Sequence, residues 1–127
     1  MNRENLKRMS AKELEAYAQT MGFSTKAAEG ADAKRELIER KREHAAELTV
    51  LGVDLTIPVK RAHDKRVVEL LNGGTDESLM KGLRMLLGDA QFSEIVDACT
   101  EDDGTEDVEA MSYAIIAITG SDELKNF

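Results

Sequence analysis

Few side chains in this sequence could carry acid–base or nucleophilic chemistry. His44 and His63 are its only histidines, and Cys99 is its only cysteine. Neither histidine has a carboxylate or cysteine partner at a metal-binding spacing such as His-x-x-x-His. Cys99 falls in an apolar helical pattern, where a buried structural thiol is more common than a nucleophile, and a single cysteine excludes an internal disulfide. We therefore expect no enzymatic activity, no catalytic residues, no cofactor and no metal site.

The acidic segment of residues 100–109 (TEDDGTEDVE) has a composition that suggests calcium binding. Aligning Gly104 with the sixth position of an EF-hand loop places Cys99 at the first position, which requires a carboxylate. The twelfth position, which requires glutamate, becomes Ala110. The segment therefore predicts an acidic turn that caps helix ends. The sequence also has no phosphate-binding glycine loop and no Gly-x-Ser-x-Gly elbow.

The composition indicates a globular protein whose charge is unevenly spread. Aromatic residues make up 4% of the chain and tryptophan is absent, so a stack of rings for single-stranded nucleic acid cannot be built. The net charge is −8, and residues 73–127 carry 3 Lys and Arg against 13 Asp and Glu. That half should repel nucleic acid and anionic membranes, so a polyanion could contact only the N-terminal half. No signal-peptide or membrane-spanning pattern is present, so we expect a cytoplasmic protein without membrane contact.

The sequence predicts that a helix starts near residue 10. Residues 2–8 are polar, and we expect them to be frayed. Ser10 is an N-cap candidate, and Glu13 completes the Ser-x-x-Glu capping box. Gly22 is expected to end this helix, and residues 23–33 read as a loop of small and polar side chains.

A second helix is expected to start at the cap Asp32 and to run to about Glu47. Leu37 and Ile38 are its only strongly apolar residues. Two apolar stripes this thin make a very small core. We therefore expect residues 1–46 to form a helix–extended-loop–helix appendage.

Residues 48–57 change the period of the apolar pattern from helical to alternating. β-branched residues dominate, and Gly52 interrupts the run. This pattern predicts a β-hairpin turning near Leu51 and Gly52, or one bulged strand, which Pro58 terminates. A lone hairpin is marginally stable in water, so it must pack on helices or pair with another chain.

Four helical patterns follow the hairpin. The first covers residues 59–71, the next two begin at the caps Thr75 and Asp89, and the last follows the acidic turn. We expect residues 47–120 to form the main domain and residues 121–127 a polar tail. The fold class predicted is α+β, predominantly helical, with an N-terminal helix–loop–helix, one β-hairpin and a C-terminal cluster of three to four helices.

Part of the N-terminal third matches a known helix–loop–helix pattern. The matching residues are Leu6, Ser10, Leu14, Tyr17, Gly22, Phe23 and the run KRELIER at 34–40. In these residues the segment resembles the SAP and Rho N-terminal modules, although its loop is longer and its charge is near neutral. The resemblance implies that the second helix contacts a DNA backbone, with Lys34, Arg35 and Arg40 as the nucleic-acid candidates. A packing or docking role is the alternative for this unit.

Residues 47–120 contain a second pattern. In order, they hold a hairpin centred on Gly52, a proline after the strand, the helical run RVVELL at 66–71, and LRMLLGDAQF at 83–92. In this order and spacing they resemble the small tail assembly chaperones of long-tailed bacteriophages and prophages. The resemblance implies a protein of the bacterial host cytoplasm that binds the tape measure protein, the tail tube protein or both during tail morphogenesis, without catalysis.

A protein-binding role requires an apolar surface, and methionine gives such surfaces adaptability. The candidates for partner binding are Met80, Leu83, Leu87 and Phe92, or the free edge of the hairpin. The methionines could instead fill the core. A second copy of the chain is a further candidate partner. The function expected is therefore a tail assembly chaperone, and the alternative is a nucleic-acid-binding accessory protein that acts through its N-terminal helix–loop–helix.

Overall fold

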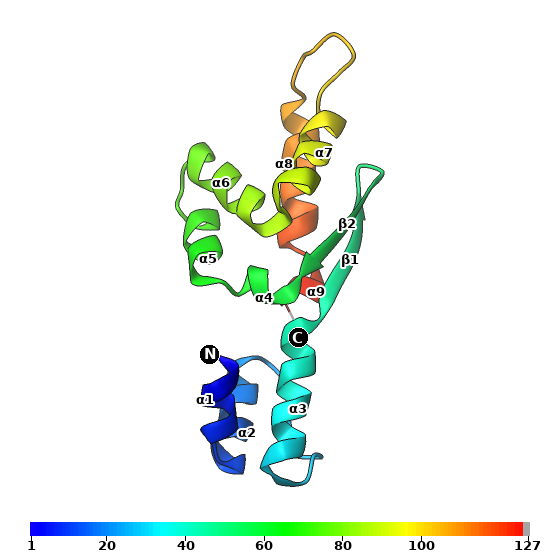
Figure 1. Cartoon of the computed structure of the whole chain (residues 1–127). Helices are drawn as coiled ribbons and strands as arrows, with labels where there is room; N and C mark the ends of the chain where they lie inside the picture. Colours follow the sequence, from blue (N-terminus) through cyan, green and yellow to red (C-terminus); the bar gives the residue numbers. More distant parts are fainter. Residues whose placement is uncertain (126–127) are drawn as a thin grey trace. The chain divides into compact units, whose positions relative to one another are not determined.

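A computed structural model describes residues 1–125 of the chain (Figure 1). It divides them into two compact units, residues 1–44 and residues 45–125. The expected fold class, predominantly helical α+β with one hairpin, is confirmed. The division falls two residues before the expected boundary, since the first strand already begins at Ala45. None of the helices within residues 1–125 is long and apolar enough to span a membrane.

Unit 1, residues 1–44, contains α1 (Arg3–Arg8), α2 (Ala11–Thr20) and α3 (Gly30–Glu43). The predicted cap of α2 is confirmed, because the Ser10 side chain accepts a hydrogen bond from the Glu13 backbone N at 3.2 Å. The three helices share a small core of fully buried side chains, namely Leu6, Leu14, Ala18 and Ile38.

Two expectations for unit 1 were wrong. Residues 2–8 are not frayed, because Asn2 caps α1 through a 2.9 Å hydrogen bond from the Asn5 backbone N and Leu6 is buried in the core. The third helix begins at Gly30 rather than after a cap at Asp32, and it ends at Glu43 instead of Glu47. The loop before it is therefore shorter than the sequence pattern suggested.

Unit 2 begins with an antiparallel hairpin of β1 (Ala45–Val50) and β2 (Val53–Pro58). The predicted turn is confirmed, and the single bulged strand is excluded. Both turn residues have positive φ, 52° at Leu51 and 78° at Gly52. Such two-residue turns match the right-handed twist of the strands. One face of the hairpin is buried, through Ala46, Val50, Leu55 and Ile57.

The rest of unit 2 is helical. Its helices are α4 (Val59–Ala62), α5 (Lys65–Leu71), α6 (Asp76–Leu87), α7 (Asp89–Ala98), α8 (Val108–Thr119) and α9 (Asp122–Lys125). The Thr75 cap is confirmed by a 3.1 Å hydrogen bond from the Ser78 backbone N to the threonine hydroxyl.

Three expectations for these helices were wrong. The helix expected over residues 59–71 breaks after α4, because Asp64 caps a new helix by accepting a 2.9 Å hydrogen bond from the Arg66 backbone N. Asp89 is the first residue of α7, and the N-cap is Gly88. The expected polar tail of residues 121–127 contains α9, whose Leu124 is buried. Residues 126 and 127 lie outside the described part of the chain.

Candidate partner-binding surface

An apolar cleft with a volume of about 320 Å³ opens in unit 2 between α6, α7 and α8. Its walls come from all three helices, through Leu79, Met80, Val96, Met111 and Ile115. Among the residues that the structure describes, the lining includes three carboxylates, those of Asp76, Glu106 and Asp107, and no lysine or arginine. The cleft therefore combines an apolar interior with negative charge.

The position of α6 explains why the cleft stays open. The C-terminal half of this helix is anchored in the core by Leu83, Leu86 and Leu87, which are all buried. Leu79 and Met80 lie one turn earlier and are only half-buried. The first turn of α6 is thus held in place by the rest of the helix, while its apolar side chains still face the cleft.

Only one of the four predicted partner-binding residues lines the cleft. Met80 lines the cleft, as a binding role requires. The prediction was wrong for Leu83 and Leu87, whose exposed fractions of 0% and 1% make them core residues. Phe92 is half-buried on α7 and is not among the residues that line the cleft. Sequence reasoning found the apolar stripes of α7 and α8 but did not identify Val96, Met111 and Ile115 as cleft residues.

Helix α8 presents apolar side chains on almost every side. Ala114 and Ile118 are buried, yet Val108, Tyr113 and Ile116 are exposed by 74%, 58% and 70%. A helix that is apolar all round is usually covered on all sides in a folded protein. Part of the outward surface of α8 is therefore apolar, and Val108, which also lines the cleft, belongs to it.

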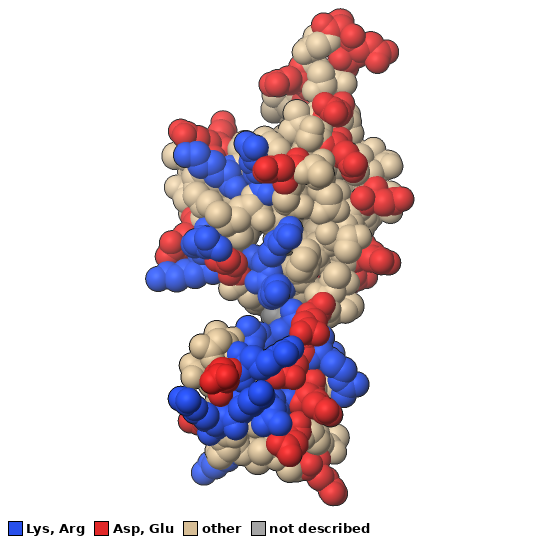
Figure 2. Space-filling view, in the orientation of Figure 1, with Lys and Arg blue, Asp and Glu red and all other residues tan. Residues whose placement is uncertain are grey.

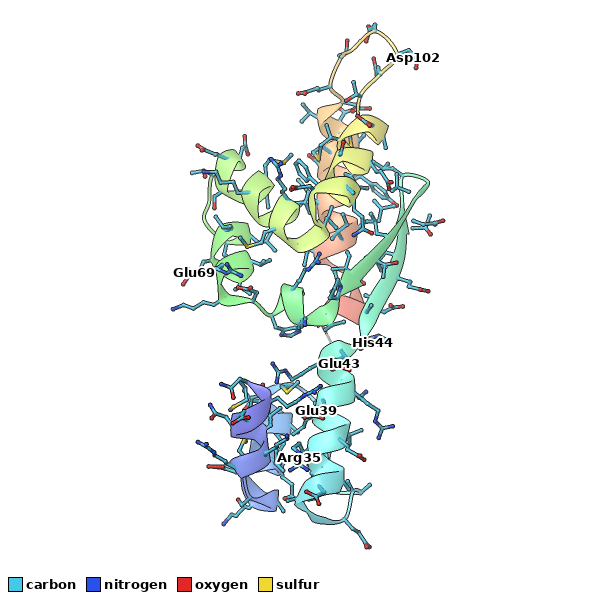
Figure 3. The ribbon with its side chains drawn as sticks, viewed as in Figure 1. Arg35, Glu39, Glu43, His44, Glu69 and Asp102 are labelled. Carbon is cyan, nitrogen blue, oxygen red and sulfur yellow. The ribbon has the colours of Figure 1, made fainter. Side chains whose placement is uncertain are left out.

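The acidic segment between α7 and α8 is an ordered loop. Thr100 and Glu106 form an isolated antiparallel bridge, and the Asp107 backbone N donates a 2.7 Å hydrogen bond to the Cys99 carbonyl. The prediction that this segment caps a helix is confirmed at α8, where the Asp107 carboxylate accepts hydrogen bonds from the backbone N atoms of Glu109 and Ala110, both at 3.0 Å. Figure 3 shows Asp102 near the tip of the loop.

The loop concentrates negative charge at one end of the cleft. Figure 2 shows its Asp and Glu side chains grouped together and exposed. Hydrogen bonds from the side chain and backbone of Thr105 lower the pKa of Asp103, so this carboxylate stays charged well below neutral pH. Because these charges are fixed on an ordered loop, they give the cleft a lasting negative potential.

Cys99 is buried against the cleft, as the sequence pattern predicted. Burial in apolar surroundings raises the pKa of its thiol, and the nearby Asp107 carboxylate raises it further. The thiol is therefore protonated at neutral pH, in contrast to the thiolates of reactive cysteines.

Each strand of the hairpin is engaged within the chain at one residue of its outer edge, Thr56 on β2 and Glu47 on β1. Gln91 of α7 accepts a 2.7 Å hydrogen bond from the Thr56 backbone N and donates a 3.0 Å one to the Thr56 carbonyl, as a neighbouring strand would. The same amide donates to the Leu87 carbonyl at 2.7 Å. On β1, the Glu47 backbone N donates to the Glu123 carboxylate at 3.2 Å. The cleft is therefore the better candidate for partner binding than a hairpin edge.

Replacing Gln91 by alanine should destabilise unit 2 by about 2 kcal/mol, because backbone groups of β2 and α6 lose their partners. Urea unfolding followed by circular dichroism measures this change. The control is alanine at Gln19, an exposed glutamine of α2. An equal and small effect of both substitutions would contradict the role assigned to Gln91.

The nucleic-acid candidates lie on α3 and differ in exposure. Lys34 is only 5% exposed, so the prediction that it contacts DNA was wrong. Its Nζ donates to the carbonyls of Thr25 and Ala28 at 2.9 and 2.8 Å and pairs with the Glu15 carboxylate at 2.8 Å. Arg35, labelled in Figure 3, pairs with Asp32 at 2.8 Å, whereas Arg40 is exposed.

The ion pair between Glu15 and Lys34 makes the stability of unit 1 depend on pH. The hydrogen bond and the positive charge of Lys34 hold the pKa of Glu15 below its ordinary value of 4.5. This contribution is fully present above pH 4.5 and is lost as the pH falls through the lowered pKa. Acid titration of unfolding should therefore show a loss of stability below that pH, and glutamine at Glu15 should reduce the loss. The hypothesis fails if both proteins have the same pH profile.

Within residues 1–125, no group of three or more His, Cys, Asp or Glu side chains is arranged to hold a metal ion. His44 is the C-cap of α3 and His63 the C-cap of α4, and both are exposed. Comparison with family models, curated proteins and solved structures found no match to the chain.

Proposed function

We propose that this chain acts by binding another protein, without catalysis, as a tail assembly chaperone of a bacteriophage or prophage. The observation that carries the proposal is the open apolar cleft of unit 2, whose lining includes the exposed Val108 of α8. The choice of tail proteins as partners rests on the resemblance of residues 47–120 to that family. In this proposal, the tape measure protein or the tail tube protein contacts the cleft while the tail is assembled in the host cytoplasm.

The character of the cleft favours a polypeptide partner. Its walls contain Met80 and Met111, whose flexible side chains adapt to different apolar shapes. Grooves of this kind bind amphipathic segments through apolar anchors. Such a surface also shields exposed apolar segments of an incompletely assembled protein, which is what an assembly chaperone must do.

The test is a pull-down from host cells after prophage induction, with nuclease present and bound proteins identified by mass. The proposal expects enrichment of a tape measure or tail tube protein on the tagged chain. The proposal is overturned if no tail protein is retained and if the proteins that do bind are retained only when nuclease is left out.

The excess of positive charge in unit 1 favours a second candidate function, nucleic-acid binding through that unit. Residues 1–44 carry 10 Lys and Arg against 8 Asp and Glu, and Figure 2 shows many of the positive side chains clustered on one face of this unit. Because Lys34 is structural, the informative variant replaces Arg40, Lys7 and Arg8 by glutamine. A salt-sensitive affinity for duplex DNA that this variant abolishes would support the second function. Affinity that is absent, or unchanged in the variant, would remove it.

A further inference from the structure

We infer that the cleft of unit 2 binds a basic amphipathic helix of its partner, with apolar side chains in the cleft and Lys or Arg side chains against the acidic loop. This inference rests on the proposed function and specifies the chemistry of the bound segment. It follows from the shape, the lining and the charge of the same surface.

The size and the lining of the cleft match side chains carried on a helix. A volume of about 320 Å³ is at the lower end of the range for binding pockets, and it is spread along three helices. Anchors spaced by three, four or seven residues on one helix would meet the methionines and isoleucine of the cleft together. Val108 of α8 lines the cleft and is exposed, so it extends the apolar surface that the rest of such a helix would cover.

The charge of the surface selects a basic segment. Three of the twelve lining residues are carboxylates: Asp76, Glu106 and Asp107. The adjoining loop adds Glu101, Asp102 and Asp103, all exposed. Opposite charges across an interface steer encounter and exclude partners of the wrong sign. An acidic partner segment would be repelled, because its carboxylates would face a loop that carries five carboxylates of its own.

A second copy of the chain does not fit this surface. Unit 2 carries 7 Lys and Arg against 17 Asp and Glu, so two such units would bring like charges together. Helices α1 and α3 of unit 1 carry more Lys and Arg than Asp and Glu, but their apolar residues Leu6 and Ile38 are already buried in the core of that unit. The occupant is therefore a different protein.

The first test uses the full chain and three synthetic helical peptides. One has leucines at helical spacing with Lys and Arg between them, the second has Glu in place of each Lys and Arg, and the third has the leucines scrambled. Fluorescence anisotropy should give an affinity for the basic peptide at least about tenfold higher than for the other two, and the difference should shrink at high salt. Equal affinity for the acidic peptide would overturn the inference.

NMR of the methionine methyl groups tests whether the basic peptide binds in the cleft. Of the six methionines, Met80 and Met111 line the cleft, whereas Met85 lies elsewhere on α6 and Met9 and Met21 belong to unit 1. Addition of the basic peptide should shift the signals of Met80 and Met111 and leave those of Met85, Met9 and Met21 in place. Shifts confined to the unit 1 signals would contradict the assignment.

Two matched pairs of variants complete the test. Tryptophan at the exposed cleft residue Ser112 should block the peptide, whereas tryptophan at Ser93, exposed on α7 outside the cleft, should not. Lysine at Glu106 should weaken binding about tenfold, and lysine at exposed Glu94 should have little effect. Equal effects within each pair would overturn the inference.

These results separate the inference from the proposed function. If a tail protein is retained in the pull-down but binds the Ser112→Trp and Glu106→Lys variants normally, the cleft is not its binding site: the inference is overturned, and the binding of a tail protein by the chain stands. If the basic peptide binds in the cleft and no tail protein is retained, the inference stands for another basic partner and the proposed function is overturned.

Discussion

Replacing Lys34 by methionine should destabilise unit 1 by about 3 kcal/mol, because it removes the charged donor that satisfies one buried and one partly buried carbonyl. Those carbonyls belong to Thr25 and Ala28, and the lost ion pair belongs to Glu15. Methionine preserves most of the apolar stem, so the effect isolates the ammonium group. Among the described residues, the core of unit 1 has only four buried hydrophobic side chains, so little other packing energy can offset the loss.

Tyrosine fluorescence measures this change in unit 1 alone. The chain has two tyrosines, and phenylalanine at Tyr113 leaves Tyr17, which packs against the core of unit 1, as the only one. In this background, Lys34→Met should lower the unfolding midpoint of unit 1 by more than about 10 °C. The control is Lys12→Met on the exposed side of α2. A shift no larger than that of the control would show that Lys34 does not hold the loop.

Replacing Gly82 by valine should destabilise unit 2 by about 3 kcal/mol, through overpacking between α5 and α6. A Cβ atom at Gly82 would lie 3.0 Å from both the Leu70 Cβ and the Leu71 backbone N. These atoms belong to a packed helix and cannot move independently. Alanine at the same position should cost less, since its gain in helix propensity of about 1 kcal/mol offsets part of the contact.

Urea unfolding of the two Gly82 variants measures the effect, and the control is valine at Lys81. Lys81 is the neighbouring position on α6 and its side chain is 64% exposed, so its ion pair with Glu77 contributes little. The close approach of α5 and α6 is disproved if Gly82→Val and Lys81→Val have equal stability. Since α6 carries Leu79 and Met80, Gly82→Val should also weaken partner binding.

Local chemistry made several parts of the fold predictable. The Ser10 and Thr75 caps depend on residues three positions apart, and both are present as expected. The turn at Leu51 and Gly52 was predicted from an apolar alternation interrupted by glycine. Signals of this kind involve neighbours in sequence and need no knowledge of the tertiary packing.

Other parts depended on packing that no local pattern reports. Helix α1 has a single buried apolar residue, Leu6, so it shows no periodicity that could be detected. Lysine is almost never fully buried, so nothing in the sequence marked Lys34 as structural. The apolar stripe of α6 was identified correctly, but its face toward the core includes Leu83 and Leu87, whereas Met80 faces the cleft. Which side of a stripe is covered depends on where the other helices lie.

The most direct measurement of the central claim compares two lysine substitutions on one helix in the same pull-down. Met80 lines the cleft, and Met85 is exposed on α6 outside it. We expect Met85→Lys to retain a tape measure or tail tube protein as the unmodified chain does, and Met80→Lys to lose it while melting as a folded protein. Retention of the tail protein by both variants, or its loss from both, would contradict binding through the cleft of unit 2.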